Sequence, residues 1–398
     1  MAGWDLLVVG GGIVGAAAAY HGARAGARVL LVDRDDVGRA TAAGAGIVSP
    51  DTDLHHSDAY HDLACRAADD YPALLDSLPR SAGWDRCGML VVAADEAEAR
   101  EHDAFTQRAL DRQRRRRDVP EALALRPIDA AMAQGLFPAL ARVERALFDP
   151  SAARIDGREV TAALHEAALA HGAERVAGSV TSFCLGAAGA ATGSTPSSRG
   201  EASPPRDSRR VTGVAVGSEE YAAGAVVVAG GAWSPLLTAQ LGLRVPVEPQ
   251  RGQIAHLGLA AADTAPWPMV SGFRDHYLVA WPGGRVAAGA TRESGSGFDP
   301  RTTAAGVREV LGEALRLAPG LAEATLLEVR VGLRPLSADG MPILGPVAGW
   351  PGLWLATGHG AAGLTLGPYS AKLVVAAALG GERAKDLDSF SLARFDSR

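Results

Sequence analysis

Short apolar runs bounded by glycine alternate with helical patterns along the first part of the chain. The runs Leu6–Val9 and Val29–Val32 are continuously apolar, which is typical of parallel strands buried on both faces. Between them, Ile13–Arg24 is rich in alanine and is followed by Gly26, which predicts a helix and its end. The order strand, glycine turn, helix, strand predicts a βαβ unit.

Later stretches add elements of the same kind and one different pattern. Residues 158–171 predict an amphipathic helix, Val226–Ala229 a buried strand, and Leu353–Ala356 with Leu364–Leu379 a last strand and helix. By contrast, HYLVAWPGGRVAAGATRE at 276–293 predicts two antiparallel strands around the turn PGGR. We expect an α/β fold in which a Rossmann-like unit is interleaved with an α+β part built on an antiparallel sheet.

The glycines after the first predicted strand have the GxGxxG spacing of a dinucleotide-binding turn. Gly10 permits the tight turn, Gly12 lets backbone amides approach a pyrophosphate, and Gly15 allows the helix to pack on the strand. Asp33 ends the second strand about 20 residues downstream, where it would accept hydrogen bonds from a ribose. The motif predicts a dinucleotide site and leaves NAD and FAD open.

Composition and charge narrow the classes of partner. The 398 residues carry a net charge of −6, which argues against a nucleic-acid partner. We interpret the basic run Arg112–Arg117 as a solvated helix face, with an anion or partner site as the alternative. Cys65, Cys87 and Cys184 have no metal or disulfide spacing, so we expect no metal and a cytoplasmic protein. We also expect no secretory signal and no membrane-spanning segment.

A loop of small residues, Gly38–Gly46, follows Asp33 where an NAD domain would continue with further βαβ units. With this loop, GRATAAGAG, the chain resembles the D-amino acid oxidase family of flavoproteins, and within it the glycine oxidase and sarcosine oxidase-like branch. The resemblance extends to CGMLVVAADEAEA at 87–99, AAGAVVVAGGAWSPLLTAQLG at 222–242 and GLRPLSADGMPILG at 332–345.

The resemblance implies FAD as cofactor, held without a covalent bond because no cysteine follows Cys184. His359 is interpreted as a flavin contact, with a base or a plain turn residue as alternatives. The last turn and helix start would stabilise negative charge on the flavin. The implied FAD contacts are Gly10, Gly12, Ile13, Val14, Gly15, Asp33, Arg34, Thr41, Ala42, Gly46, Ile47, Val180, Gly230, Trp233, Gly358, His359, Gly360, Gly363, Leu364 and Thr365.

Two further residues are implied to meet the substrate. Taken alone, Arg334 would be read as a surface charge or an ion pair. The resemblance implies that it grips a substrate carboxylate through two parallel hydrogen bonds. Tyr277 is implied to turn its hydroxyl toward the substrate, with a packed cross-strand aromatic as the alternative. His276 is expected to face the opposite side of the strand.

The sequence departs from the family pattern at two places. In GHGAAG at 358–363, Ala361 stands where the glycine oxidase branch carries a second arginine, so we expect a substrate larger than glycine. The stretch 186–210 is rich in Gly, Ala, Ser and Pro without hydrophobic period, which predicts a flexible insertion within a hairpin.

The expected function is FAD-dependent oxidation of the CH–NH bond of an amino acid or secondary amine by hydride transfer to flavin N5, with oxygen or a quinone as electron acceptor. The alternatives are an FAD-dependent 2-hydroxy acid dehydrogenase and an FAD-holding subunit of a larger complex. A homo-oligomer is compatible with the sequence.

The resemblance also implies a division of the chain into interleaved domains. The FAD-binding segments are 1–85, 149–245 with the insertion 186–210, and 333–398. The substrate-domain segments are 86–148 and 246–332.

Overall fold

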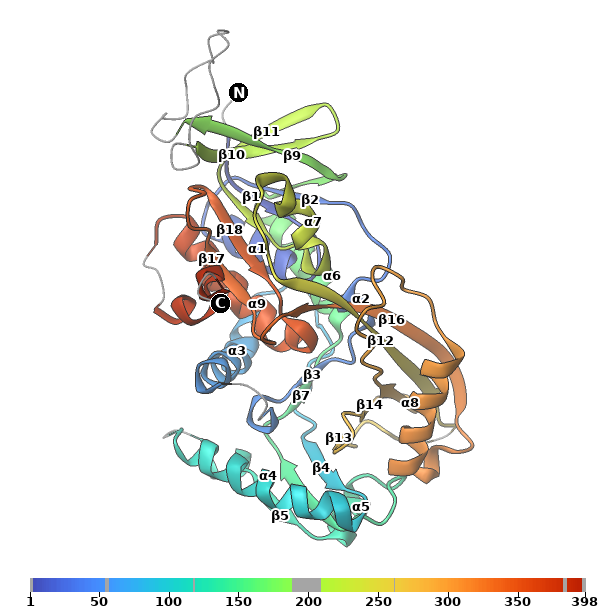
Figure 1. Cartoon of the computed structure of the whole chain (residues 1–398). Helices are drawn as coiled ribbons and strands as arrows, with labels where there is room; N and C mark the ends of the chain where they lie inside the picture. Colours follow the sequence, from blue (N-terminus) through green and yellow to red (C-terminus); the bar gives the residue numbers. More distant parts are fainter. Residues whose placement is uncertain are drawn as a thin grey trace.

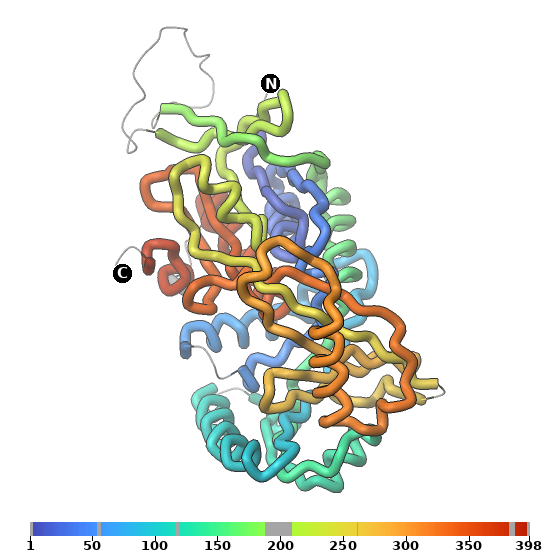
Figure 2. The backbone as a smooth tube through the Cα atoms, turned by 45° about the vertical axis from the view of Figure 1, so that its right-hand side comes forward, coloured from blue at the N-terminus to red at the C-terminus, as the bar shows by residue number. Residues whose placement is uncertain are grey.

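The chain folds around two large sheets that lie in different parts of the molecule (Figure 1). The computed structural model describes residues 3–53, 57–116, 119–187, 209–260, 262–381 and 385–395. Figure 2 shows the same two parts in a second view, each built from segments that are far apart in the sequence.

The first sheet contains the predicted βαβ unit. Its central order is β17-β18-β11-β1-β2-β8, and all neighbours in this series are parallel except β17 and β18. The central strands are buried on both faces, which explains their continuous apolar sequences. β10 joins this sheet antiparallel to β11, and β9 pairs with β10. The strands are β1 (Trp4–Val9), β2 (Val29–Asp33), β8 (Glu174–Ala177), β9 (Val180–Ala187), β10 (Arg209–Val216), β11 (Glu219–Val228), β17 (Ile343–Pro346) and β18 (Leu353–Thr357).

Helix α1 packs between α6 and α9 against this sheet. It is made mostly of alanine and glycine, so the neighbouring helices and strands can approach it closely. The predicted ends of this helix are confirmed, since α1 begins at Ile13 and ends at Arg24. The helices are α1 (Ile13–Arg24), α2 (Ala40–Ala43), α3 (Asp58–Asp76), α4 (Glu96–Arg114), α5 (Ala130–Leu136), α6 (Gly157–Ala170), α7 (Ser234–Thr238), α8 (Ala304–Leu317) and α9 (Gly363–Ala378).

The second sheet has the order β16-β12-β15-β14-β13-β4-β6-β5. Its pairs are antiparallel, as expected, except for the parallel pair of β4 and β13. The predicted hairpin around PGGR is present as β14 and β15. The strands are β4 (Met89–Ala93), β5 (Arg126–Ile128), β6 (Arg145–Asp149), β12 (Val247–Gly258), β13 (Met269–Gly272), β14 (Tyr277–Trp281), β15 (Arg285–Gly289) and β16 (Thr325–Ser337).

Two long strands and one buried arginine connect the parts. β12 and β16 run side by side from the first part of the molecule into the second (Figure 1). Arg154, in the short strand β7 (Ala153–Arg154) that pairs with β3 (Ile47–Val48), is 1% exposed. Its guanidinium donates to the carbonyls of Ala265 and Ala280 and pairs with Asp85. These bonds fix the small sheet of β3 and β7 to β14 and to the segment before β13 in the second sheet.

The predicted insertion falls mainly outside the described residues. β9 ends at Ala187 and β10 begins at Arg209, and the two strands pair antiparallel. The expected hairpin is therefore present, and residues 188–208 between its strands are not described.

Candidate active site

A cavity of about 1070 Å³ extends between the two sheets. One end lies at the carboxyl ends of β1 and β2, where Val9 and Val32 line it, as is usual for ligands of parallel sheets. The other end reaches Val91 and Ile254 on the second sheet. Because ordinary ligand pockets have volumes of roughly 300–1,000 Å³, this cavity has room for a dinucleotide and a small substrate together.

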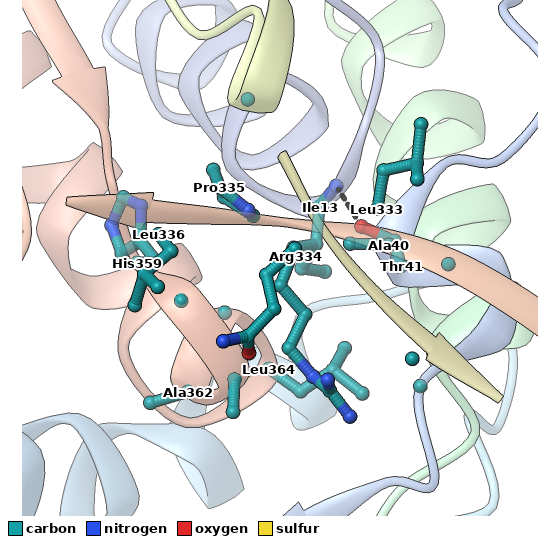
Figure 3. A pocket seen from close by; sticks show the side chains of 18 of the residues that line it. Ile13, Ala40, Thr41, Leu333, Arg334, Pro335, Leu336, His359, Ala362 and Leu364 are labelled. Atoms are coloured by element: carbon teal, nitrogen blue, oxygen red, sulfur yellow. Dashed lines mark hydrogen bonds between the residues drawn. The ribbon is translucent and has the colours of Figure 1, made fainter. Parts of the chain in front are cut away.

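The glycine turn forms the first end of the cavity. Gly10 has a φ of +105°, and a Cβ on Gly15 would lie 1.7 Å from the Gly10 carbonyl oxygen, so neither position accepts a side chain. Helix α1 starts after Gly12 without a capping side chain. The Ile13 N–H donates to Thr41 Oγ1 at 3.2 Å (Figure 3), which docks the small-residue loop on the positive end of the helix.

Asp33 lies where the fingerprint predicts, and it already has three partners. Its Oδ1 accepts from the Gly11 N–H at 3.0 Å, and its Oδ2 pairs with Arg39 and, at 3.3 Å, with Arg175. Burial acts to raise the pKa of this carboxyl, but Arg39, Gly11 and Arg175 outweigh it and hold the pKa below its ordinary value. Asp33 is therefore an anion, and a ribose would share it with Arg39, a residue that sequence reasoning missed.

The last helix closes the cavity against the small-residue loop. Thr365 Oγ1 donates to the carbonyl of Ile47 at 3.2 Å, and the Tyr71 hydroxyl donates to the carbonyl of Leu364. Helix α9 begins at Gly363 without a side-chain cap, and its first three residues line the cavity. The positive end of the helix therefore faces the cavity. This arrangement suits an anionic or electron-accepting part of a ligand.

Most residues predicted to bind the cofactor line this cavity, and three do not. Gly15 packs beneath the turn, the carbonyl of Ala42 accepts from Arg158 Nε at 2.8 Å, and Gly358 shapes the last turn with a φ of +74°. Arg34 lies at the rim, 2.7 Å from Asp36. The lining residues are Gly10, Gly12, Ile13, Val14, Asp33, Arg34, Thr41, Gly46, Ile47, Val180, Gly230, Trp233, His359, Gly360, Gly363, Leu364 and Thr365.

His359 lines the cavity with its ring turned to a fixed partner. Its Nε2 lies 2.8 Å from the hydroxyl of Ser370 in α9, and burial lowers the pKa of the imidazole to about 4. The ring is therefore neutral at physiological pH and supplies no positive charge to the site. Its role as a flavin contact stays a prediction, and the hydrogen bond to Ser370 argues against a role as base.

We expect His359→Gln to flatten the dependence of stability on pH. An unfolded histidine titrates near 6.5 and the buried one near 4, so the unfolded state binds more protons between these values. The stabilisation is complete above about pH 6.5 and is lost as the pH falls toward 4. At pH 5 the loss from this one group amounts to about 2 kcal/mol. Urea unfolding at pH 7 and pH 5 measures this loss. An equal change in the free energy of unfolding between the two pH values in the variant and the parent protein would contradict the argument.

Arg334 and Tyr277 lie at the second end of the cavity. Arg334 projects into it from β16 (Figure 3), and its Nη1 donates to the carbonyl of Thr291 at 2.9 Å. No carboxylate pairs with Arg334 among the described residues. Burial lowers the pKa of the guanidinium, while Tyr277 and the charge of Glu293 act in the opposite direction. A half-buried cation without a directly paired carboxylate is costly, and a bound carboxylate would reduce this cost.

Two glycines that sequence reasoning missed make room for these side chains. A Cβ on Gly252 would lie 2.5 Å from the Arg334 guanidinium, and a Cβ on Gly289 would lie 2.7 Å from the Tyr277 hydroxyl. Gly252 is paired with Gly332 in β16, two positions before Arg334, so the arginine lies diagonally across its neighbour strand. Such a diagonal contact depends on the strand register and is not visible in the sequence.

We expect Gly252→Ala to lower kcat/KM for a carboxylate substrate roughly 10- to 100-fold, because the new methyl displaces the Arg334 guanidinium. The methyl meets the mobile end of a long side chain, so the thermal midpoint should change little. Steady-state kinetics and thermal unfolding measure the two effects. Gly258→Ala in the same strand is the control, since its methyl would meet only the exposed side chain of Leu327. Equal losses in both variants would exclude a specific effect on Arg334.

The structure bears out the expected direction of the His276 side chain. His276 Nε2 lies 3.5 Å from Glu309 of α8, and α8 packs with Leu278 on the face of the sheet opposite to the one where Tyr277 packs. His276 is nevertheless among the residues at the edge of the cavity, and its Nδ1 lies 2.6 Å from the carbonyl of Arg274.

The basic run is only partly the solvated face that its sequence predicts. Arg114 and Arg115 are exposed, but Arg116 pairs at 3.0 Å with Asp51, which is 1% exposed. Asp51 also lies 3.0 Å from His61 Nε2, with Cys65 close by. Although three potential metal ligands meet here, Arg116 already supplies the positive charge, and burial raises the pKa of the Cys65 thiol to about 12. The cluster ties the end of α4 to the turn Pro50–Thr52 and to α3.

Comparisons with known proteins agree with a flavin-binding cavity. The family model described as FAD dependent oxidoreductase (DAO) matches residues 5–377. Glycine oxidase of Pseudomonas putida is 32% identical over 387 residues, covering 95% of this chain and 95% of that protein. Iminodiacetate oxidase of Chelativorans sp. BNC1 superposes with a TM-score of 0.86 at 37% identity, over 97% of this chain and 98% of that one. Glycine oxidase of Geobacillus kaustophilus gives 0.83 at 27%, over 98% of each.

The fold and the cavity thus define an enzyme of the dinucleotide-binding oxidoreductase class. The chain belongs to the DAO family of FAD-dependent oxidoreductases, with FAD as its cofactor. The cradle fits this group, because Gly10 and Gly46 line it at positive φ and a side chain on either would collide with neighbouring backbone.

Among the described residues, none of the helices combines the length and apolar composition that crossing a bilayer requires.

Proposed function

We propose that this enzyme oxidises the CH–N bond of a small amino acid or secondary amine that carries a carboxylate. The observation that carries the proposal is Arg334, a half-buried cation that faces the cavity and forms no ion pair with a carboxylate among the described residues. The names of the relatives support it, since glycine and iminodiacetate both hold a nitrogen one carbon away from a carboxylate. The prediction of Arg334 as a clamp is retained as part of this proposal.

FAD, when bound, supplies the acceptor for a hydride. Arg334 would hold the carboxylate by two parallel hydrogen bonds, and so fix the orientation of the adjacent carbon. The substrate loses that hydride and the proton of its nitrogen, which leaves an imine. Water then hydrolyses the imine to a 2-oxo acid, with release of ammonia, or of an amine when the nitrogen carries a second carbon.

The rings at this end offer no free base, which favours an amine over a 2-hydroxy acid. Burial raises the pKa of the Tyr277 phenol, against the pull of Arg334, so the phenol stays protonated. His359 is neutral and bonded to Ser370, and the His276 ring lies against the carbonyl of Arg274. A hydroxyl proton needs a base to accept it, whereas a neutral amine loses its hydride without one.

Anaerobic mixing of the FAD-loaded enzyme with a panel of compounds tests this proposal. The panel contains glycine, sarcosine, iminodiacetate, D-amino acids, cyclic imino acids and 2-hydroxy acids. We expect amines, and not hydroxy acids, to bleach the flavin absorbance. Bleaching by 2-hydroxy acids would instead support the dehydrogenase alternative, and no bleaching by any compound would support a role as an FAD-holding subunit. Hydrogen peroxide formed on readmission of air would identify oxygen rather than a quinone as acceptor.

A further inference from the structure

The segment that follows β15 is held by β12 and presents alternate residues to the cavity. Arg251 and Glu293 exchange backbone hydrogen bonds of 3.1 and 2.9 Å, and the Thr291 hydroxyl donates to Glu293 Oε1 at 2.7 Å. Side chains alternate along an extended segment, so Arg292 faces the side opposite to Thr291 and Glu293. Ala290 and Arg292 line the cavity accordingly.

Arg292 forms a longer and more exposed ion pair than Arg251, the arginine that holds this segment. Arg251 pairs with Glu293 at 2.6 Å and with Asp299 at 3.1 Å. Arg292 lies 3.6 Å from Asp275 through its Nε, with side chains 44% and 59% exposed. A contact of this length and exposure contributes little. The outer nitrogens of the Arg292 fork are thus available to a ligand in the cavity.

Arg292 and Arg334 serve the same end of the cavity. The carbonyl that accepts from Arg334 belongs to Thr291, the residue next to Arg292. The charges of both arginines act on the phenol of Tyr277. The lining of the cavity from the second sheet and its loops includes apolar residues, such as Val91, Ile254 and Phe273, and the carboxylate of Asp275 that pairs with Arg292.

We propose that Arg292 selects substrates with a second carboxylate, which it binds while Arg334 holds the first. The substrate class is a small amine with a carboxylate on each arm of the nitrogen or at each end of a short amino acid. This inference rests on the proposed function, since it concerns the substrate of the same site. Two cations that line one cavity match a short dianion, and a ligand with one carboxylate would leave Arg292 with Asp275 alone.

Paired probes that cannot be oxidised at nitrogen separate binding from turnover. Thiodiacetate carries two carboxylates around a sulfur, and (ethylthio)acetate has the same chain with one of them replaced by a methyl group. Calorimetric titration of the FAD-loaded enzyme measures both affinities. We expect thiodiacetate to bind about tenfold more tightly. Arg292→Met should abolish this preference and leave the affinity for (ethylthio)acetate unchanged.

A matched pair of substrates and a control variant complete the test. In turnover, Arg292→Met should lower kcat/KM for iminodiacetate about tenfold relative to N-ethylglycine. Arg301→Met, an exposed arginine bound to Asp299 and outside the cavity lining, should keep the parent ratio. The inference is overturned if the parent enzyme shows no preference, if Arg292→Met keeps it, or if Arg301→Met loses it equally. Selective binding of thiodiacetate, together with no flavin bleaching by iminodiacetate or any other amine, would contradict the proposed function and leave the two-carboxylate site standing.

Discussion

Replacing Arg334 by methionine is expected to lower kcat/KM for a carboxylate substrate by about 10²–10³-fold while FAD stays bound. The loss of one partner of a buried, hydrogen-bonded charge pair costs roughly 2–5 kcal/mol, and each 1.4 kcal/mol is a factor of ten. Most of the effect should fall on KM, because the carboxylate is held in the ground state as well as in the transition state. Arg334→Lys should recover part of the activity, since lysine supplies the charge without the planar fork.

Steady-state kinetics of the purified variants measure the loss of kcat/KM, and their flavin absorbance measures the retention of FAD. Arg330→Met is the control on the same strand, because Arg330 pairs with Glu328 and does not line the cavity. Unchanged kinetics in Arg334→Met would end the carboxylate-clamp hypothesis. Loss of FAD from Arg334→Met would show that the residue supports the cofactor instead.

Gly15→Ala is expected to yield a protein that does not retain FAD. The new methyl would lie 1.7 Å from the Gly10 carbonyl, so α1 must move away from the turn that receives the pyrophosphate. Overpacking of this kind costs roughly 1–3 kcal/mol of folding free energy. We expect at least a 100-fold increase in the dissociation constant for FAD. The end of α1 and the glycine turn would no longer be placed to bind the pyrophosphate together.

Flavin fluorescence titration of the apoprotein and urea unfolding measure these effects. Gly312→Ala in α8 is the control, since a methyl there meets no atom within 4 Å and alanine favours the helix by up to about 1 kcal/mol. A Gly15→Ala protein that purifies with a full complement of FAD would refute this account of the turn.

The cofactor half of the site could be predicted from the sequence because its signals are local. The strand, turn and helix around Gly10 and Gly15 follow within a few residues, and their periods and glycine spacing need no information from elsewhere in the chain. The helix α1 accordingly has the predicted ends.

The substrate half could be predicted only in part, because its geometry depends on strand register. Gly252 matters through its diagonal contact with Arg334, and Arg292 matters through an alternation set by Glu293 and Arg251. Such pairings join residues far apart in the chain, and one-residue shifts would reverse them. An arginine just after a predicted strand, as in ATRE, is the signal that could have directed attention to Arg292.

The buried ion pairs of the charged clusters also could not be predicted from the sequence. The run Arg112–Arg117 shows no period that distinguishes an inward arginine from an outward one, yet Arg116 binds the buried Asp51. Likewise, nothing in GRATAAGAG marks Arg39 as the partner of Asp33. Buried ion pairs require knowledge of which loops meet, and helical or strand patterns carry none.

The position of α9 has a consequence for biosynthesis. Gly10 lies in the turn after β1, which leaves the ribosome long before Leu364 and Thr365 of α9, and residues from both regions line one cavity. β18 also pairs with β11, beside β1, so the first sheet gains this strand only late in translation. Capture of FAD must therefore follow synthesis of α9, and nascent chains that stop before it should emerge colourless however well their first βαβ unit has formed.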